Sequence, residues 1–176
     1  MFESLFESWI RQAITDVLED GAEISRGADG ALQTGLSLPI ADEPESVDFW
    51  VTFTKNAPNY TAEGEAIDPD APEYLVISLW IPGEDVLPPQ ATDHAGTFAL
   101  LNAYNQEPGI KCRVDSDTFP GPRDAPVLVE ADLAFGSIAG PEPIASAIER
   151  LADFAINSLP AIRTYLAAEY AAGLTG

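Results

Sequence analysis

Apolar residues in the first 17 positions recur roughly every three to four residues, the spacing of one helix face. They are Phe2, Leu5, Phe6, Trp9, Ile10, Ala13, Ile14 and Val17. Acidic and other polar residues occupy most positions between them. The pattern therefore predicts an amphipathic helix that buries one side and ends near Asp20-Gly21.

The apolar spacing then shortens to two, which is typical of strands with one buried face. The segment EISRGADGALQTGLSLPI predicts two short strands about a Gly-Ala-Asp-Gly turn, and residues 46–55 and 73–82 predict two longer strands. The inward positions of the longer strands are Val47, Phe49, Val51, Phe53, Leu75, Ile77, Leu79 and Ile81. An acidic loop at 55–72 and a Pro-rich loop at 81–90 are the segments expected to be most mobile.

The second half predicts a helix, a hairpin and a long helix. Asp93 is a good N-cap for a helix whose apolar positions include Phe98, Leu101 and Tyr104, and Pro108-Gly109 stops it. Strands at 110–114 and 127–133 follow. The outward Lys111 and Arg113 are expected to face Glu130 and Asp132 across the hairpin.

A final helix at 140–173 carries apolar residues at helical spacing, and Pro160 should kink or break it. The expected apolar positions are Ile144, Ile148, Leu151, Phe154 or Ala155, Ile162, Tyr165 and Leu166. Hairpins in place of regular strand-helix-strand crossovers indicate an α+β fold, with an N-terminal, a central and a long C-terminal helix packed on an antiparallel sheet. We expect one domain spanning residues 1–176.

Charge changes the functional picture, because 29 Asp and Glu residues oppose 8 Lys and Arg and the formal net charge is -21. Such a chain repels nucleic-acid phosphates and anionic lipids, so neither is an expected partner. Recruitment of a basic partner, or mimicry of DNA, stays open as an alternative to a merely solvated surface. Acids at Glu3 and Glu7 do not fit a signal peptide, and no apolar run is long enough to span a membrane, so we expect a cytoplasmic protein.

Candidate catalytic residues are few. His94 is the only histidine, at an expected helix start, so any Ser-His or Cys-His pair would have to include it. Cys112, the only cysteine, alternates with Ile110 and Val114, as expected for a small buried side chain. Neither residue has partners at catalytic spacing, so we predict no enzyme.

Metal and cofactor motifs are also missing. One histidine and one cysteine exclude the usual structural zinc sets. A calcium-like start at Asp115 and Asp117 fails at Phe119 and at Pro120, where the loop requires glycine. The acids of 68–73 could gather a weak cation but are better explained as a solvated loop, and no phosphate-binding glycine motif occurs. We therefore expect neither metal nor cofactor.

Four large side chains alternate away from the expected core, and they are the candidate partner-binding residues Trp50, Tyr74, Val76 and Trp80. A sheet with helices on one side must cover or use its second face. The same side chains could therefore lie beneath the acidic loop or another helix.

The stretch FALLNAYNQEPGIKCRVD, with the later VLVEADLAFGSIAGPEPIASAIERLADFA, resembles the YbjN family of bacterial proteins, which has a type III secretion chaperone-like fold. The family pattern of two asparagines about an aromatic residue falls on Asn102, Tyr104 and Asn105, which we interpret as structural. The alternative is an Asn-lined pocket at the helix end. The resemblance implies a regulator of sensory transduction without enzymatic activity, and its chaperone relatives act as dimers that bind extended client segments.

The leading hypothesis is a non-enzymatic regulatory or protein-interaction domain that forms a homodimer and binds a protein client or regulatory partner. The alternative is a small-molecule sensor with a pocket between the sheet and the long helix. A hydrolase built on His94 ranks third.

Overall fold

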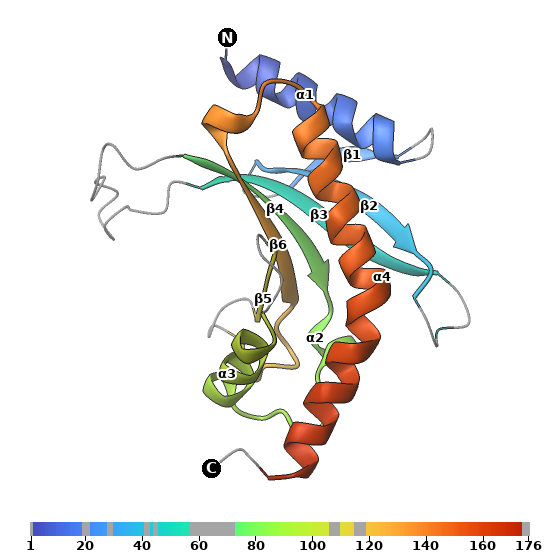
Figure 1. The fold of residues 1–176 in the computed structure, drawn as a ribbon, viewed down its shortest axis with the longest axis vertical. Helices are drawn as coiled ribbons and strands as arrows, with labels where there is room; N and C mark the ends of the chain where they lie inside the picture. Colours follow the sequence, from blue (N-terminus) through green and yellow to red (C-terminus); the bar gives the residue numbers. More distant parts are fainter. Residues whose placement is uncertain are drawn as a thin grey trace.

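The computed structural model describes residues 2–18, 22–27, 30–40, 43, 46–56, 73–105, 110–114 and 119–173 (Figure 1). Its elements in chain order are α1 (Phe2–Val17), β1 (Ile24–Arg26), β2 (Leu32–Leu38), β3 (Val47–Asn56), β4 (Tyr74–Ile81), α2 (Gly83–Val86), α3 (His94–Tyr104), β5 (Ile110–Val114), β6 (Val127–Ala134), a 3-10 turn (Phe135–Ser137) and α4 (Glu142–Ala171). The predicted helices and strands are present, and Asp93 caps α3 by accepting hydrogen bonds from the backbone N–H groups of Ala95 and Gly96.

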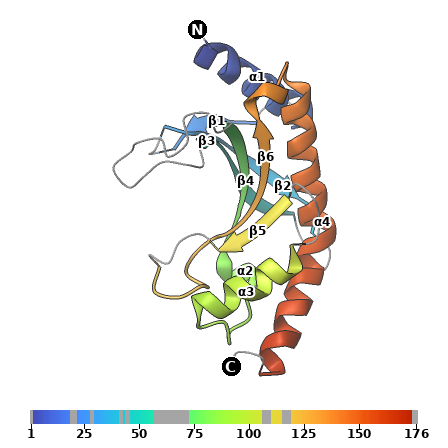
Figure 2. The same cartoon turned by 60° about the vertical axis from the view of Figure 1, so that its left-hand side comes forward.

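The strands described form one antiparallel sheet in the order β1-β2-β3-β4-β6-β5, so the fold class is α+β as predicted. The β5–β6 hairpin joins the sheet through β6, which pairs with β4 and leaves β5 at the edge. Figure 2 shows α1 and α4 on the same side of the sheet. We call the side under these helices the inner face and the opposite side the outer face.

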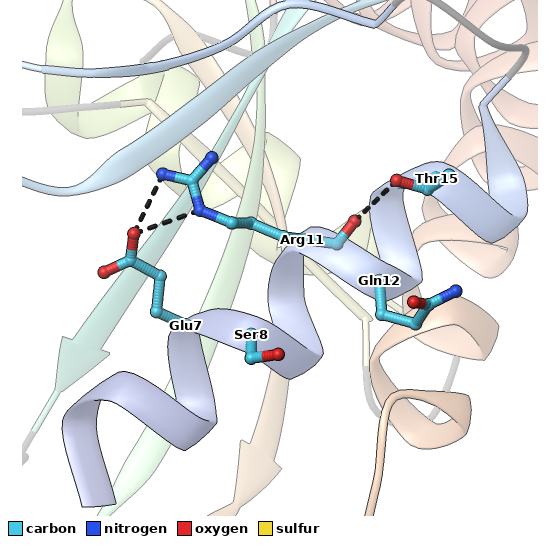
Figure 3. A pocket seen from close by; sticks show the side chains of 5 residues that line it. All are labelled: Glu7, Ser8, Arg11, Gln12 and Thr15. Atoms are coloured by element: carbon cyan, nitrogen blue, oxygen red, sulfur yellow. Dashed lines mark hydrogen bonds and ion pairs between the residues drawn. The ribbon is translucent and has the colours of Figure 1, made fainter. Parts of the chain in front are cut away.

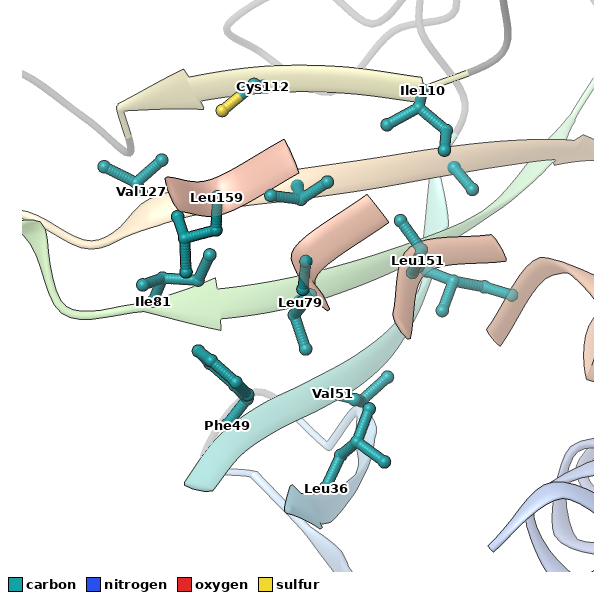
Figure 4. Close-up of a cluster of buried hydrophobic side chains, with 14 of the residues drawn as sticks. Leu36, Phe49, Val51, Leu79, Ile81, Ile110, Cys112, Val127, Leu151 and Leu159 are labelled. Atoms are coloured by element: carbon teal, nitrogen blue, oxygen red, sulfur yellow. The ribbon is translucent and has the colours of Figure 1, made fainter. Parts of the chain in front are cut away.

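The core lies between α4 and the inner face. Alternate residues of the strands point toward the buried stripe of α4, including Leu79 and Ile81 from β4 and Leu151 and Leu159 from α4 (Figure 4). Ala155 rather than Phe154 occupies the buried position that the helical spacing left open. The small alanine lets the helix approach the strands closely, while Phe154 lies at the margin of the core.

Pro160 does not break the last helix, because α4 continues from Glu142 to Ala171 with the proline inside it. Proline removes one helical hydrogen bond and costs about 3 kcal/mol in an isolated helix. Here Leu159 and Ile162 on either side of it are fully buried against the sheet. Their burial offsets the lost hydrogen bond, so of the two expected outcomes, a kink or a break, the break does not occur.

The Pro-rich segment 81–90, expected as a loop, is partly helical and partly buried. It contains the one-turn helix α2, and Val86 and Leu87 are both buried in the core. A Cβ atom on Gly83 would lie 2.2 Å from the carbonyl oxygen of Ala125, so only glycine allows this approach. Of the acidic loop expected at 55–72, Lys55 and Asn56 belong to β3, and residues 57–72 lie outside the described part of the chain.

Two apolar positions expected to face the core are exposed instead. They are Leu5 of α1 and Phe98 of α3, the latter with 50% of its surface accessible. Both helices contact the rest of the molecule over a narrower stripe than their apolar pattern indicates. None of the helices in the described ranges combines the length and the apolar content needed to cross a bilayer.

Candidate functional site

An apolar row crosses the outer face of the sheet. The strand register places Trp50 of β3 opposite Trp80 of β4, Trp80 opposite Leu128 of β6, and Leu128 opposite Arg113 of β5. Trp50 is 56% exposed, Trp80 is half-buried and Leu128 is buried. The row therefore offers one large exposed aromatic ring supported by side chains that are already packed.

Of the other two predicted contact residues, Tyr74 is half-buried and Val76 is only 8% exposed. Val76 therefore presents little surface to a partner. The accessible part of the predicted site is concentrated at Trp50, with Trp80 and Tyr74 contributing partial surface.

A polar row lies next to the apolar one and holds it in place. The indole Nε1 of Trp80 donates a hydrogen bond of 2.9 Å to Thr52 Oγ1, which sets the orientation of that ring. Ser78 Oγ donates to Glu130 Oε1 at 3.2 Å. Because its N–H is satisfied inside the sheet, Trp80 is a fixed platform beside the more exposed Trp50.

The predicted cross-strand ion pairs on this face are confirmed. Arg113 donates to both carboxylate oxygens of Glu130, at 2.8 and 3.0 Å, and Lys111 Nζ lies 2.6 Å from Asp132 Oδ2. The hydrogen bond to Asp132 raises the pKa of Lys111 above its ordinary value. These pairs neutralise two acids of the outer face, while Asp48, two residues before Trp50 on the same strand face, is exposed.

The two motif asparagines have different roles. The side chain of Asn105 accepts a hydrogen bond of 2.7 Å from the backbone N–H of Cys112 and donates one of 3.0 Å to the carbonyl of the same residue. It therefore ties the end of α3 to the edge strand β5, as the structural interpretation predicted. Asn102 is exposed, and the side chain of Tyr104 is outside the described set.

A cavity of about 830 Å³ lies between α1 and the inner face of the sheet, and we call it the α1 cavity. Its apolar lining comes from α1, three strands and the turn after β6. The main apolar residues are Phe6, Trp9, Ile10, Leu32, Phe53, Leu75, Phe135 and Ile138. The small-molecule alternative expected a pocket beneath the long helix, whereas this cavity lies beneath the first helix.

Charged side chains line the same cavity. Lys55 Nζ lies 3.0 Å from Glu73 Oε1 and 5.5 Å from the centroid of the Phe135 ring. Arg26 Nη2 lies 2.5 Å from Glu7 Oε2, and Arg11 also pairs with Glu7. Hydrogen bonds from Arg11 and then Arg26 lower the pKa of Glu7 below its ordinary value.

Sequence reasoning missed this cavity, although one signal was available. Lys55 continues the inward alternation of Phe49, Val51 and Phe53 along β3. A lysine in the inward phase of a strand indicates that the core opens to solvent at that point, because an unpaired buried ammonium group is very costly. The nearness of α1 and Phe135 to Lys55 required the tertiary structure.

A second depression lies on the exposed side of α1 and is shallow (Figure 3). Its residues Glu7, Arg11 and Thr15 bond within the helix, with Arg11 donating to Glu7 and Thr15 Oγ1 donating to the carbonyl of Arg11. Gln12 donates to Asp16 one turn later. These groups stabilise the helix surface and do not converge on a common point.

His94 and Cys112 occupy separate structural positions. His94 is half-buried, and its Nε2 lies 3.1 Å from the carbonyl oxygen of Phe119, so this nitrogen carries the hydrogen. Cys112 points into the core with 2% exposure (Figure 4), and burial, followed by the charge of Glu130, raises the pKa of its thiol to about 12. In the part of the chain that the structure describes, no hydrogen bond pairs His94 with a serine or cysteine.

Among the described residues we find no metal site, because no group of three or more His, Cys, Asp or Glu side chains is placed to hold an ion. Of the two acidic stretches considered from the sequence, residues 68–72 and 115–118 lie outside the described part of the chain, and Glu73 pairs with Lys55.

Comparison with models of protein families, with curated proteins and with solved structures finds no match to this chain. The resemblance to the YbjN family therefore depends only on the sequence pattern of this chain.

Proposed function

We propose that this chain is a non-enzymatic, cytoplasmic protein-interaction domain that binds a partner protein on the outer face of its sheet. The observation that carries the proposal is Trp50, which is 56% exposed beside the fixed ring of Trp80. Exposed aromatic side chains supported by packed neighbours are typical anchors of protein interfaces. The resemblance to YbjN and chaperone-like proteins supports the same kind of role.

The partner we propose carries positive charge next to an apolar anchor. Asp48 is exposed on the same strand face as Trp50, and the whole chain has a formal net charge of -21. Such a field attracts basic partners and repels acidic ones. An extended segment could therefore place an aromatic or aliphatic side chain on Trp50 and a Lys or Arg beside Asp48.

We further propose that two copies of the chain associate through α3. Residues His94–Tyr104, HAGTFALLNAY, contain no Asp, Glu, Lys or Arg. The exposed positions of the helix form one stripe at helical spacing, made of Ala95, Phe98, Ala99 and Asn102. Because two chains of this charge repel each other, they approach most favourably where neither carries an ionised side chain.

The two surfaces can be tested with a matched pair of variants. Trp50→Ser removes an aromatic ring that is 56% exposed, and Phe98→Ser removes one that is 50% exposed on a different element. Binding is measured by fluorescence anisotropy of a labelled peptide of alternating lysine and leucine, with a glutamate-leucine peptide as the charge control. Oligomeric state is measured by analytical ultracentrifugation.

We expect wild type to be a dimer that binds the basic peptide and not the acidic one. Trp50→Ser should weaken peptide binding about tenfold, as for a moderate hot spot, and remain a dimer. Phe98→Ser should be a monomer with unchanged peptide affinity per chain. Equal peptide binding by Trp50→Ser and wild type would refute the outer-face site, and a monomeric wild type would refute the α3 dimer.

A further inference from the structure

The helix α1 leaves a gap above the sheet. It packs mainly along α4 and makes few direct contacts with the strands, although Phe6, Trp9 and Ile10 point toward the inner face. The opposite wall is formed by Leu32, Phe53 and Leu75. Between these apolar surfaces lies the α1 cavity, whose volume of about 830 Å³ is within the usual size of small-molecule sites.

Aromatic rings make one end of the cavity rigid. The ring centroids of Phe6 and Phe135 are 4.7 Å apart, and those of Phe6 and Trp9 are 5.9 Å apart. Contacts between aromatic rings favour particular relative orientations, so each ring restricts the rotation of its neighbour. An apolar ligand would therefore meet a preformed wall, which reduces the entropy lost on binding.

The rim of the cavity is less acidic than the chain as a whole. Two basic residues, Arg26 and Lys55, line it together with two acids, Glu7 and Glu73, and each base is paired with one of the acids. The whole chain has 8 basic and 29 acidic residues, whereas the cavity lining carries equal numbers of the two signs. Because Glu7 is already shared by two arginines, Lys55 is the cation best placed to accept a new anion.

We propose that the α1 cavity binds an amphipathic monocarboxylic acid, with its apolar body against Phe6, Phe53 and Phe135 and its carboxylate at Lys55 Nζ. The carboxylate takes the place of Glu73, whose side chain is 43% exposed and turns into solvent. The site is on the inner face, opposite the Trp50 surface, so this inference does not rest on the proposed function.

A cationic amphiphile fits less well despite the acidity of the chain. The face of Phe135 that a cation would use already has Lys55 Nζ at 5.5 Å. Glu7 is engaged by two arginines, which leaves only Glu73 as a counter-charge. Screening in physiological salt also limits the distant acids to weak effects, because their field decays over about 8 Å.

The test is isothermal titration calorimetry with dodecanoate, dodecanol and dodecyltrimethylammonium, each below its micelle concentration. We expect dodecanoate to bind most tightly. Lys55→Gln should weaken dodecanoate about fivefold and leave dodecanol unchanged, while Glu73→Gln should tighten dodecanoate about threefold by removing the competing carboxylate. Lys111→Gln, at the only other lysine and in an ion pair on the outer face, is the matched control and should change nothing.

Ala31→Trp provides an independent check, because it adds a large ring to a residue that lines the cavity. It should weaken both dodecanoate and dodecanol more than tenfold, with an unchanged circular dichroism spectrum. The proposal is overturned if dodecanoate does not bind, if the ammonium compound binds as tightly, or if Lys55→Gln and Lys111→Gln behave alike.

Discussion

The hydrogen bonds of Asn105 give the sharpest test of how this fold is held together. Its side chain bonds both the N–H and the carbonyl of Cys112, at 2.7 and 3.0 Å. Cys112 lies on β5, the edge strand of the sheet. The Asn105 side chain therefore satisfies backbone groups of Cys112 that no other described strand pairs on that side. Asn105→Ala removes the side-chain oxygen and the side-chain N–H that make these two hydrogen bonds. The N–H and the carbonyl of Cys112 then lose the bonds that the Asn105 side chain makes to them.

The size of the effect follows from those two bonds. A typical intramolecular hydrogen bond contributes about 0.5–1.5 kcal/mol, so losing both should destabilise the protein by about 1–3 kcal/mol. For a chain of this length each kcal/mol lowers Tm by roughly 2–4 °C, so we expect a fall of about 2–12 °C. Asn105→Asp should also be destabilised, because a carboxylate can accept from the Cys112 N–H but repels the carbonyl oxygen.

Asn102 provides the matched control, since it is the other motif asparagine and lies exposed on the same helix. Urea unfolding followed by circular dichroism measures the free energy of unfolding for each variant. Measured in the monomeric Phe98→Ser background, where the proposed α3 dimer does not contribute, Asn102→Ala should lie within about 0.5 kcal/mol of its parent, as for most surface substitutions. Equal losses of stability from the two alanine substitutions would show that the Asn105 bonds do not stabilise the folded state.

Three other predictions follow from particular contacts. Gly83→Ala should destabilise the protein by about 2 kcal/mol or more in urea unfolding, because its Cβ would meet the Ala125 carbonyl at 2.2 Å, whereas Gly136→Ala, with open space around it, should cost little. Cys112 should resist alkylation by iodoacetamide at pH 8 in the folded protein and react once unfolded in urea, since its pKa is raised to about 12; rapid native labelling would contradict its burial. The pKa of Glu7 is lower when folded than when unfolded, so the stabilisation it provides is present above its ordinary pKa of 4.5 and disappears as the pH falls through the folded value. The stability gap between wild type and Glu7→Gln should therefore shrink below pH 4.5 in thermal unfolding, and a constant gap would refute the assignment.

Local patterns accounted for much of the secondary structure. The period-two apolar positions of β3 and β4 all face the core, and Asp93 caps α3 where its chemistry indicated. The pairing of Lys111 and Arg113 with Glu130 and Asp132 also followed from alternation across one hairpin. Such features depend on residues close together in the chain, so their physics is visible in the sequence.

Predictions failed where packing against distant segments decided the outcome. Pro160 stays helical because Leu159 and Ile162 are buried on the sheet, and Gly83 begins a helical turn because it fits against Ala125. The exposure of Phe98 likewise depends on how little of α3 the remaining fold covers. The helix or loop propensity of a single residue does not predict these contacts, because their free energy depends on residues that are distant in the sequence.

The amino-acid sequence by itself determined the helical and strand periods, the inward and outward faces of each strand, and the large negative charge. Only the tertiary structure decided that Trp50 stands exposed beside a fixed Trp80, and that Lys55 meets Glu73 and Phe135 at the mouth of a cavity under α1. The physical reason is that periodicity assigns a side chain to a face. The packing of the other elements then determines whether that face is covered, exposed or hollow.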